Sequence, residues 1–313
     1  MTVFRNPGER GNSRRPLPPR LVLGAGIMAV SSAAIFIRYA QADAPSLTIA
    51  AYRLALATLF LLPIVCLRQR RELSSLKASD WRWALAAGIF LAIHFGTWIT
   101  SLEYTSVASS VVLVSTSPLW VALAAWLFMG EPLTPRLLAG LLLALSGGAV
   151  ISFVEGQSGV ASNPLLGNVL ALIGALAVSG YWLIGRRLRR HLSLIPYVTI
   201  VYGFAALALL AAAILLRQPL TGFKTATYGW FLLLALIPQL LGHSSFNWAL
   251  AHLPAAYVAI ATLGEPVGAA LLAFLLLGET PSVMKLAAAA LIMAGIFLTL
   301  NPHAGHFKKQ SDL

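Results

Sequence analysis

Ten long runs of apolar residues limit this chain to few folds. Each run is close to the roughly 20 residues that an α-helix needs to cross the hydrocarbon core of a bilayer. The runs are too long for membrane strands and lack the alternation of a β-barrel. The sequence therefore predicts an all-α membrane protein with ten transmembrane helices. The predicted spans are residues 21–40, 46–67, 83–102, 106–129, 135–153, 164–185, 194–216, 227–250, 255–277 and 282–300.

The charge content agrees with this class, because only 10% of the residues are charged, against about 25% in a soluble domain. The predicted connections are short and leave no room for a soluble domain. Residues 1–20 are basic and rich in Pro and Gly, which predicts a disordered cytoplasmic tail without a cleavable signal. The single cysteine, Cys66, excludes an internal disulfide and a cysteine metal cluster.

The net charge of +12 is distributed unevenly between the two sides of the predicted membrane protein. When the connections are numbered from the N-terminus, the two tails and the even-numbered connections hold 17 of the 22 Lys and Arg residues. Basic residues concentrate on the cytoplasmic side of membrane proteins, so both termini are predicted to be cytoplasmic. The basic clusters then orient the chain and contact anionic lipids. We expect no nucleic-acid partner.

The two halves of the sequence fall into register when one is shifted by 148 residues. This repeat predicts two five-helix units, residues 21–153 and 164–300, with a linker at 154–163 and a cytoplasmic tail at 301–313. Because each unit has an odd number of spans, the second is inserted upside down. Inverted repeats are typical of secondary transporters that work by alternating access. The matched positions include Gly26 and Gly174, Pro118 and Pro266, Gly130 and Gly278, Glu131 and Glu279, and Gly147 and Gly295.

Three segments resemble a known family. "ASSVVLVSTSPLWVALAAWLFMGEPLT" and "AYVAIATLGEPVGAALLAFLLLGETPS" resemble the two copies of the EamA domain of the drug/metabolite transporter superfamily, and "AAYRLALATLFLLP" is similar to the second helix of its first copy. The resemblance covers about residues 20–300 and is nearest to the YddG-type exporters of aromatic and other amino acids. It implies ten helices in a bacterial inner (cell) membrane, both termini in the cytoplasm, and export of small metabolites.

A Gly-Glu pair follows both the fourth and the ninth apolar run. Gly130 and Gly278 can adopt the left-handed conformation that ends a helix. Glu131 and Glu279 are then expected near the N-terminus of the next helix, where a carboxylate can cap free backbone N–H groups. We interpret both pairs as structural turns.

Pro118 and Pro266 fall near the middle of the fourth and ninth spans. A proline inside a helix removes a backbone hydrogen bond and kinks or loosens the helix. In a membrane the freed carbonyl needs another partner, and residues 115–117, "STS", are close enough to supply it. The symmetric placement favours hinges for alternating access, and the alternative is a pair of static kinks.

Glu265 precedes the second of these prolines in the middle of the ninth span. An ionisable group at this depth is costly and is therefore a functional candidate. One interpretation is a site that couples transport to a proton. The other is an architectural role, in which Glu265 bonds the backbone that Pro266 loosens. The family resemblance favours the second, because the pattern often has Glu before this proline whatever the substrate.

Polar and aromatic side chains form one stripe on the third helix and one on the eighth. The repeat makes these helices symmetry mates, so the stripes are predicted to face each other across a central cavity, with two residues of the sixth helix in its wall. Aromatic groups there suit a flat ring or a cation, whereas the alternative for each residue is interhelical hydrogen bonding. The predicted substrate-binding residues are His94, Trp98, Tyr181, Trp182, His243 and Asn247.

Two further features have alternative interpretations. Arg53 in the second span is interpreted as extending outward toward Asp43, and the alternative is a bond to a substrate carboxylate. Small residues seven apart on the fifth and tenth helices permit close packing, either of the two repeats or of two chains. These residues are Gly140, Gly147, Ala288 and Gly295.

The sequence carries no recognisable enzyme motif. It lacks a phosphate-binding loop, H-E-x-x-H, G-x-S-x-G and a pair of mid-membrane aspartates. His94 and His243 have no further ligands nearby in the pattern, so neither a metal nor another cofactor is expected. Charge rings typical of channels are also missing. We predict a monomeric secondary transporter that exports amino acids, aromatic and other neutral ones. The alternatives are a lipid flippase or scramblase, a transporter of another metabolite class and, less favoured, an intramembrane enzyme.

Overall fold

The computed structural model describes residues 19–129, 135–158, 162–253 and 255–299, and all regular secondary structure within these ranges is helical. Among these residues, seven segments, each one helix or two to three consecutive helical segments, are long and apolar enough to cross a membrane. They correspond to the first four and to the sixth, seventh and eighth predicted spans. The fifth span lies in a 24-residue helix, and the ninth and tenth contain shorter apolar helices, Thr262–Leu277 and Val283–Gly295. An all-helical, multi-pass architecture is thus confirmed, while the count of ten stays a prediction.

The first unit contains eight helical segments, several of which together form one span. They are α1 (Pro19–Ser31), α2 (Ala33–Gln41), α3 (Ser46–Arg68), α4 (Arg70–Ser74), α5 (Ala78–Tyr104), α6 (Val107–Val114), α7 (Ser117–Met129) and α8 (Pro135–Ser158). The second unit follows the same plan with more interruptions. Its segments are α9 (Pro164–Leu188), α10 (Leu194–Leu215), α11 (Thr225–Leu234), a π-helix (Ala235–His243), α12 (Ser244–Ala249), α13 (Ala255–Ala261), a 3₁₀ turn (Thr262–Gly264), α14 (Glu265–Leu277) and α15 (Val283–Thr299).

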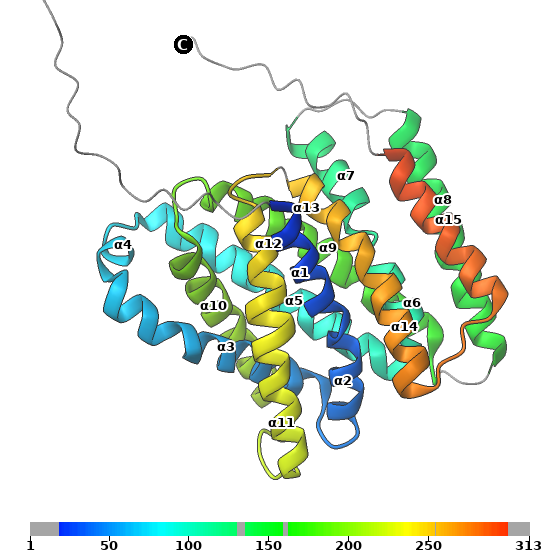
Figure 1. Ribbon diagram of the computed structural model, residues 1–313, viewed down its shortest axis with the longest axis horizontal. Helices are drawn as coiled ribbons and strands as arrows, with labels where there is room; N and C mark the ends of the chain where they lie inside the picture. The colour runs from blue at the N-terminus through cyan, green and yellow to red at the C-terminus, as the bar shows by residue number, and fades with distance from the viewer. Residues whose placement is uncertain (1–18, 130–134, 159–161, 254, 300–313) are drawn as a thin grey trace, which may run out of the picture.

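Helices of the two units pack against each other in a symmetric pattern. The pairs are α5 with α9, α1 with the π-helix, α3 with α10, and α8 with α15. Exchanging the units converts the first pair into the second and leaves the other two unchanged. The α8–α15 pair lies at one edge of the molecule (Figure 1). The core therefore forms between the repeats, as expected when neither unit can bury its apolar and polar faces alone.

The small-residue face of α8 packs against α15 of the same chain. A Cβ atom added to Gly147 would lie 2.6 Å from Cγ1 of Ile292 and 2.8 Å from the carbonyl oxygen of Ala288. Only a residue without a side chain permits this approach of the two backbones. Of the two arrangements open from the sequence, the structure shows contact between the repeats.

Both helices that contain a central proline are interrupted just before it. Hydrogen bonding of the Thr116 hydroxyl to the carbonyl of Leu113 closes the break between α6 and α7. A similar bond before Pro266 joins the hydroxyl of Thr262 to the carbonyl of Ala259, at 2.7 Å. The carbonyl that each proline leaves without its helical donor lies four residues earlier, at Val114 and at Thr262, so neither hydroxyl bonds the freed carbonyl itself. The expectation that a serine or threonine before Pro118 bonds that carbonyl is not met by Thr116, which bonds the neighbouring carbonyl of Leu113.

The turn after α14 has the predicted glycine conformation but a different capping partner. Gly278 ends α14 with φ of +69°, in the left-handed region. The Glu279 carboxylate does not cap the following helix; it accepts the backbone N–H of Val107 at the start of α6, at 3.1 Å. It also pairs with Arg38 at 3.7 Å. The sequence pattern predicts that Glu279 caps the helix that follows it, α15. Because α14 packs against α6, the carboxylate instead caps the N-terminus of α6. Gly130, Glu131 and Pro132 lie outside the described residues.

Candidate functional site

A small cavity of about 30 Å³ lies where the two units meet. Its walls come from α5, α9, the π-helix with α12, and the interrupted helices that contain the two central prolines. The lining residues are His94, Trp98, Val114, Ser115, Ser117, Val178, Trp182, His243, Phe246, Thr262 and Glu265. Four of the six predicted substrate-binding residues are among them. Interrupted membrane helices at the interface of two repeats are where transporters commonly hold their substrates.

The stripes of the third and eighth helices come together at this cavity. The ring of His94 stacks on Trp98 at 5.9 Å with 9° between the planes, and it lies 6.1 Å from the ring of His243. Phe95, whose ring meets His243 edge-on at 5.1 Å, completes the contact. His94 and His243 are near-equivalent positions of the repeat, so the cavity lies close to the symmetry axis.

The eighth helix is locally irregular at its stripe. Residues 235–243 form a π-helix that contains Pro238. Segments of this kind are frequent at functional sites. Gln239 and His243 in the π-helix and Asn247 in α12 are all buried.

Several polar atoms at the cavity have no hydrogen-bond partner among the described residues. They are the indole nitrogens of Trp98 and Trp182, the hydroxyl oxygen of Ser115 and Nδ1 of His243. By contrast, Nδ1 of His94 is within 2.9 Å of the carbonyl oxygen of Gly174. Unpaired buried polar atoms are rare in folded proteins. The cavity therefore offers hydrogen-bonding capacity to a polar ligand.

Tyr181 and Asn247 do not line this cavity. The Tyr181 hydroxyl donates to Oδ1 of Asn247 at 2.7 Å, and Nδ2 of Asn247 donates to the hydroxyl of Tyr202 at 3.1 Å. The guanidinium of Arg189 donates to the backbone carbonyl of Asn247 at 3.0 Å. These contacts tie the sixth, seventh and eighth helices together beside the cavity. In the structure, Tyr181 and Asn247 thus form interhelical hydrogen bonds, which is the alternative to substrate binding given above.

Arg53 lies in the interior and does not reach Asp43, which corrects the favoured interpretation of the sequence. Its Nε donates to Oε1 of Gln239 at 2.7 Å, and its guanidinium carbon lies 4.1 Å from the centre of the Phe95 ring. Asp43 instead accepts from the backbone N–H of Lys224, at 2.7 Å. The side chain of Arg53 turns inward because α3 packs against the π-helix, which presents Gln239 to it.

Glu265 is the first residue of α14 and lines the cavity. A carboxylate at a helix N-terminus is stabilised by the helix dipole. In the described part of the chain it accepts no hydrogen bond and forms no ion pair, so the bond to the backbone near Pro266 that the architectural interpretation invokes is not present. Pro118 and Pro266 are the second residues of α7 and α14 and adjoin the cavity through Ser117 and Glu265.

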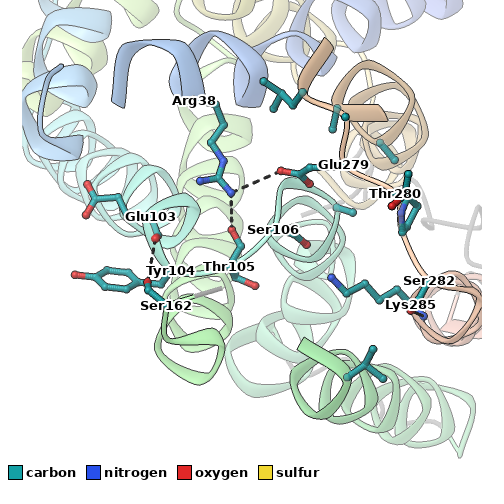
Figure 2. Close-up of a pocket in the computed structure, with 17 residues that line it drawn as sticks. Arg38, Glu103, Tyr104, Thr105, Ser106, Ser162, Glu279, Thr280, Ser282 and Lys285 are labelled. Atoms are coloured by element: carbon teal, nitrogen blue, oxygen red, sulfur yellow. Dashed lines mark hydrogen bonds and ion pairs between the residues drawn. The ribbon is translucent and has the colours of Figure 1, made fainter. Parts of the chain in front are cut away.

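A larger vestibule of about 500 Å³ opens at the end of the molecule where α2, α5 and α14 finish. Figure 2 shows Arg38 at its centre, hydrogen-bonded to the carbonyl of Thr105 at 3.0 Å and paired with Glu279. Glu103 and Lys285 also line it. These helix ends are the ones that the charge pattern predicts to lie outside the cell.

The vestibule and the central cavity share two helices. Ala108 of α6 and Ala270 of α14 line the vestibule, whereas Ser115 and Glu265 line the cavity. Ala108 and Ser115 are seven positions apart, which corresponds to about 10 Å of helix. We consider the cavity the candidate substrate site, because the unpaired buried polar atoms described above lie there.

The interrupted helices contribute to the cavity wall, although the stripes predicted from the sequence do not include them. Ser115, Ser117 and Thr262 line the cavity, whereas the sequence pattern predicts the serines only as partners for the loosened backbone. Their signal was available as small polar residues within four positions of Pro118 or Pro266. Phe246 gave no such signal, because one aromatic residue in an apolar helix is commonplace.

Comparison with known proteins explains this architecture. Residues 20–153 and 165–301 each match the EamA-like transporter family. This chain belongs to that family. The two matches place one EamA unit on either side of the central cavity. A small-molecule transporter in a membrane is the function that this membership supports.

Several proteins whose names describe a transporter are similar to this chain at low identity. An uncharacterized transporter of Archaeoglobus fulgidus is 23% identical, covering 89% of this chain and 96% of the relative. A protein of Salmonella typhimurium named "probable amino-acid metabolite efflux pump" is 28% identical, over 68% of this chain and 71% of its own length. A "probable terminal-alkyne amino-acid exporter" of Streptantibioticus cattleyicolor is also 28% identical, over 60% and 62%. A solved crystal structure with 20% identity superposes with a TM-score of 0.64, covering 90% of this chain and 95% of the other, and supports the fold.

Proposed function

We propose that this EamA protein is a secondary transporter that exports amino acids, aromatic and other neutral ones, by alternating access. The observation that carries the proposal is the cavity between the repeats, where interrupted helices meet a set of aromatic and imidazole rings. Trp98, Trp182, His94 and His243 offer flat faces to a ring or an apolar side chain. The names of the relatives from Salmonella typhimurium and Streptantibioticus cattleyicolor support the same substrate class.

The size of the cavity requires movement during transport. Its volume of about 30 Å³ is far below the roughly 300–1,000 Å³ of ligand pockets in proteins. An amino acid therefore enters only when the helices around the cavity separate. The breaks before Pro118 and Pro266 supply hinges for that movement in both repeats. Glu265, which lines the cavity and has no partner among the described residues, is the candidate group for coupling transport to a proton.

The membrane arrangement of this transporter follows from the charge pattern and the repeats. Ten spans form two inverted units, residues 21–153 and 164–300, joined by residues 154–163. Residues 1–20 and 301–313 are cytoplasmic tails of a protein in the bacterial inner membrane. The chain acts as a monomer without a cofactor, since both halves of the pathway are contained within it. It carries out transport and not an enzymatic reaction.

The test is transport by purified protein reconstituted into proteoliposomes. Vesicles are loaded with unlabelled amino acids, and counterflow of a panel of radiolabelled amino acids is measured. We expect saturable uptake of at least one aromatic or aliphatic amino acid, and none in vesicles without protein. Movement of fluorescent lipids in the absence of any amino-acid counterflow would instead support a lipid flippase or scramblase.

A further inference from the structure

The guanidinium of Arg53 is a buried charge with incomplete hydrogen bonding. The side chain is fully buried, and both terminal nitrogens, Nη1 and Nη2, have no partner among the described residues. Its one hydrogen bond, from Nε to Gln239, involves a neutral amide. A buried charge is stable only when other groups compensate it. The fold therefore holds two N–H donor groups ready for an acceptor.

The opposite charge that acts on Arg53 is that of Glu265, but the two groups form no ion pair among the described residues. Arg53 and Glu265 attract each other electrostatically through the interior, although the ion pairs of the described residues do not include them. Glu265 lines the cavity together with His94 and His243. The guanidinium of Arg53 contacts the ring of Phe95, which in turn meets His243 edge-on, but Arg53 itself is not among the residues that line the cavity. A substrate therefore reaches the guanidinium only when the helices separate, as the cavity volume already requires.

Among the other unpaired groups near this pair, the Ser115 hydroxyl and Nδ1 of His243 can donate or accept, and the remaining ones are donors only. The indole nitrogens of Trp98 and Trp182 and Nε2 of Gln239 each carry hydrogen and have no partner in the described part of the chain. Indole and guanidinium groups cannot accept hydrogen bonds. Apart from the Glu265 carboxylate, the surroundings of the cavity consequently favour a ligand rich in acceptor oxygens. A carboxylate fits that requirement, and the planar guanidinium can bind it with two parallel hydrogen bonds.

We propose that Arg53 and Glu265 bind the two charged groups of a zwitterionic amino acid. Arg53 holds the α-carboxylate through its free N–H groups, and Glu265 holds the α-ammonium group. The side chain of the substrate then lies against Trp98, Trp182 and the histidines. This assignment rests on the proposed function and restricts it to substrates that carry both charges. The competing arrangement is a direct Arg53–Glu265 ion pair in another conformation, which would make both residues structural.

The first experiment uses the unaltered protein in lipid nanodiscs and needs no mutation. Displacement of radiolabelled L-phenylalanine is measured with phenethylamine, which lacks the carboxylate, and with 3-phenylpropionate, which lacks the ammonium group. Because a hydrogen-bonded charged group contributes about 1.5–3 kcal/mol, each analogue is expected to bind about 10- to 150-fold more weakly. If leucine and not phenylalanine binds, 3-methylbutylamine and 4-methylpentanoate replace the two analogues.

The second experiment tests which residue binds which charged group of the substrate. In Arg53→Gln the preference for phenylalanine over phenethylamine should largely disappear, while the preference over 3-phenylpropionate remains. Glu265→Gln should show the reverse pattern. Arg187→Gln is the matched control, because Arg187 also lies over an aromatic ring, Trp83, at 4.6 Å but is exposed. If Arg53 and Glu265 form a structural ion pair instead, each variant should bind phenylalanine and both analogues more weakly by the same factor.

The possible results distinguish a failure of the Arg53 and Glu265 assignment from a failure of the proposed function. If phenylalanine or leucine is transported but both single-charge analogues bind as well as the amino acid, the assignment is wrong and amino-acid export stands. If no amino acid binds or moves, both are overturned. Should Arg53→Gln fail to fold, the analogue series on the unaltered protein still decides.

Discussion

The rings of His94 and Trp182 reach the central cavity from different helices, α5 and α9. If they contact the substrate, replacing either by Ala removes a stacking surface. Such contacts contribute roughly 0.5–1.5 kcal/mol beyond burial. We therefore expect His94→Ala and Trp182→Ala to weaken amino-acid binding about three- to tenfold. Titration of each purified variant by substrate-induced thermal stabilisation measures the change.

The control for this pair is Trp126→Ala, since Trp126 is exposed on the surface of α7. Trp120 is less suitable, because its indole donates to the hydroxyl of Thr116 at the helix break, at 3.1 Å. Unchanged affinity in both cavity variants, with normal folding, would mean that the rings only pack the helices together.

Asp43 provides a pH-dependent contact at the start of α11. Its pKa is held below the usual value by the hydrogen bond from the backbone N–H of Lys224 and then by that from the Thr227 hydroxyl. Because the folded state has the lower pKa, the stabilisation is complete above about pH 5 and is lost as the pH falls through the folded-state value. Asp43→Ala should therefore unfold at a lower temperature than the unaltered protein at pH 7.

The difference for Asp43→Ala should shrink toward pH 3, as thermal unfolding in detergent at several pH values would show. Asp43→Asn retains an acceptor for the capping bonds and isolates the effect of the charge. A difference between the unaltered protein and Asp43→Ala that is constant from pH 7 to pH 3 would contradict this account.

Among the elements, the interrupted fourth and ninth helices are the predicted moving parts. Pro118 and Pro266 each prevent a continuous helix at the cavity. Replacement by Ala permits the missing backbone hydrogen bond and should favour one straight helix. We expect Pro118→Ala and Pro266→Ala to slow counterflow while substrate affinity stays within about twofold, a difference of roughly 0.4 kcal/mol. Rates equal to those of the unaltered protein in both variants would identify the breaks as static.

The α8–α15 contact depends on the missing side chain of Gly147. A methyl group there meets the carbonyl of Ala288 and the side chain of Ile292 at less than 3 Å, so the helices must separate. Overpacking of this kind usually costs about 1–3 kcal/mol. Gly147→Ala should lower the unfolding temperature in detergent. In Gly229→Ala, where no atom lies within 4 Å of the added carbon, the same change should be neutral or stabilising. Equal behaviour of the two variants would argue against close packing.

At the scale of the whole molecule, the uneven distribution of Lys and Arg predicts the orientation. Reporter tags at the N-terminus and the C-terminus should be cytoplasmic, and a tag at Gly156, between the two units, should be periplasmic. The vestibule around Arg38 and Glu279 would then open outward. A periplasmic C-terminus would rule out two units of five spans each. It would leave the membership of the EamA family unaffected.

The sequence by itself determined the class of fold and the existence of the repeat. Both depend on local properties, because apolar length decides whether a segment crosses a membrane and equivalent residues such as Pro118 and Pro266 recur at a constant shift. The meeting of His94 with His243 also followed, since near-equivalent residues of a two-fold repeat lie close to its axis. These inferences required no knowledge of how any helix is rotated.

Only the tertiary structure decided which side chains face the cavity. Tyr181 and Trp182 are neighbours in one helix, yet Trp182 lines the cavity and Tyr181 bonds Asn247 beside it. Arg53 turned inward because the π-helix presents Gln239 to it, and Glu279 caps α6 because α14 packs there. Such choices depend on helix rotation, helix breaks and contacts between residues far apart in the chain. The free energies that separate these arrangements belong to contacts across helices, which no local pattern contains.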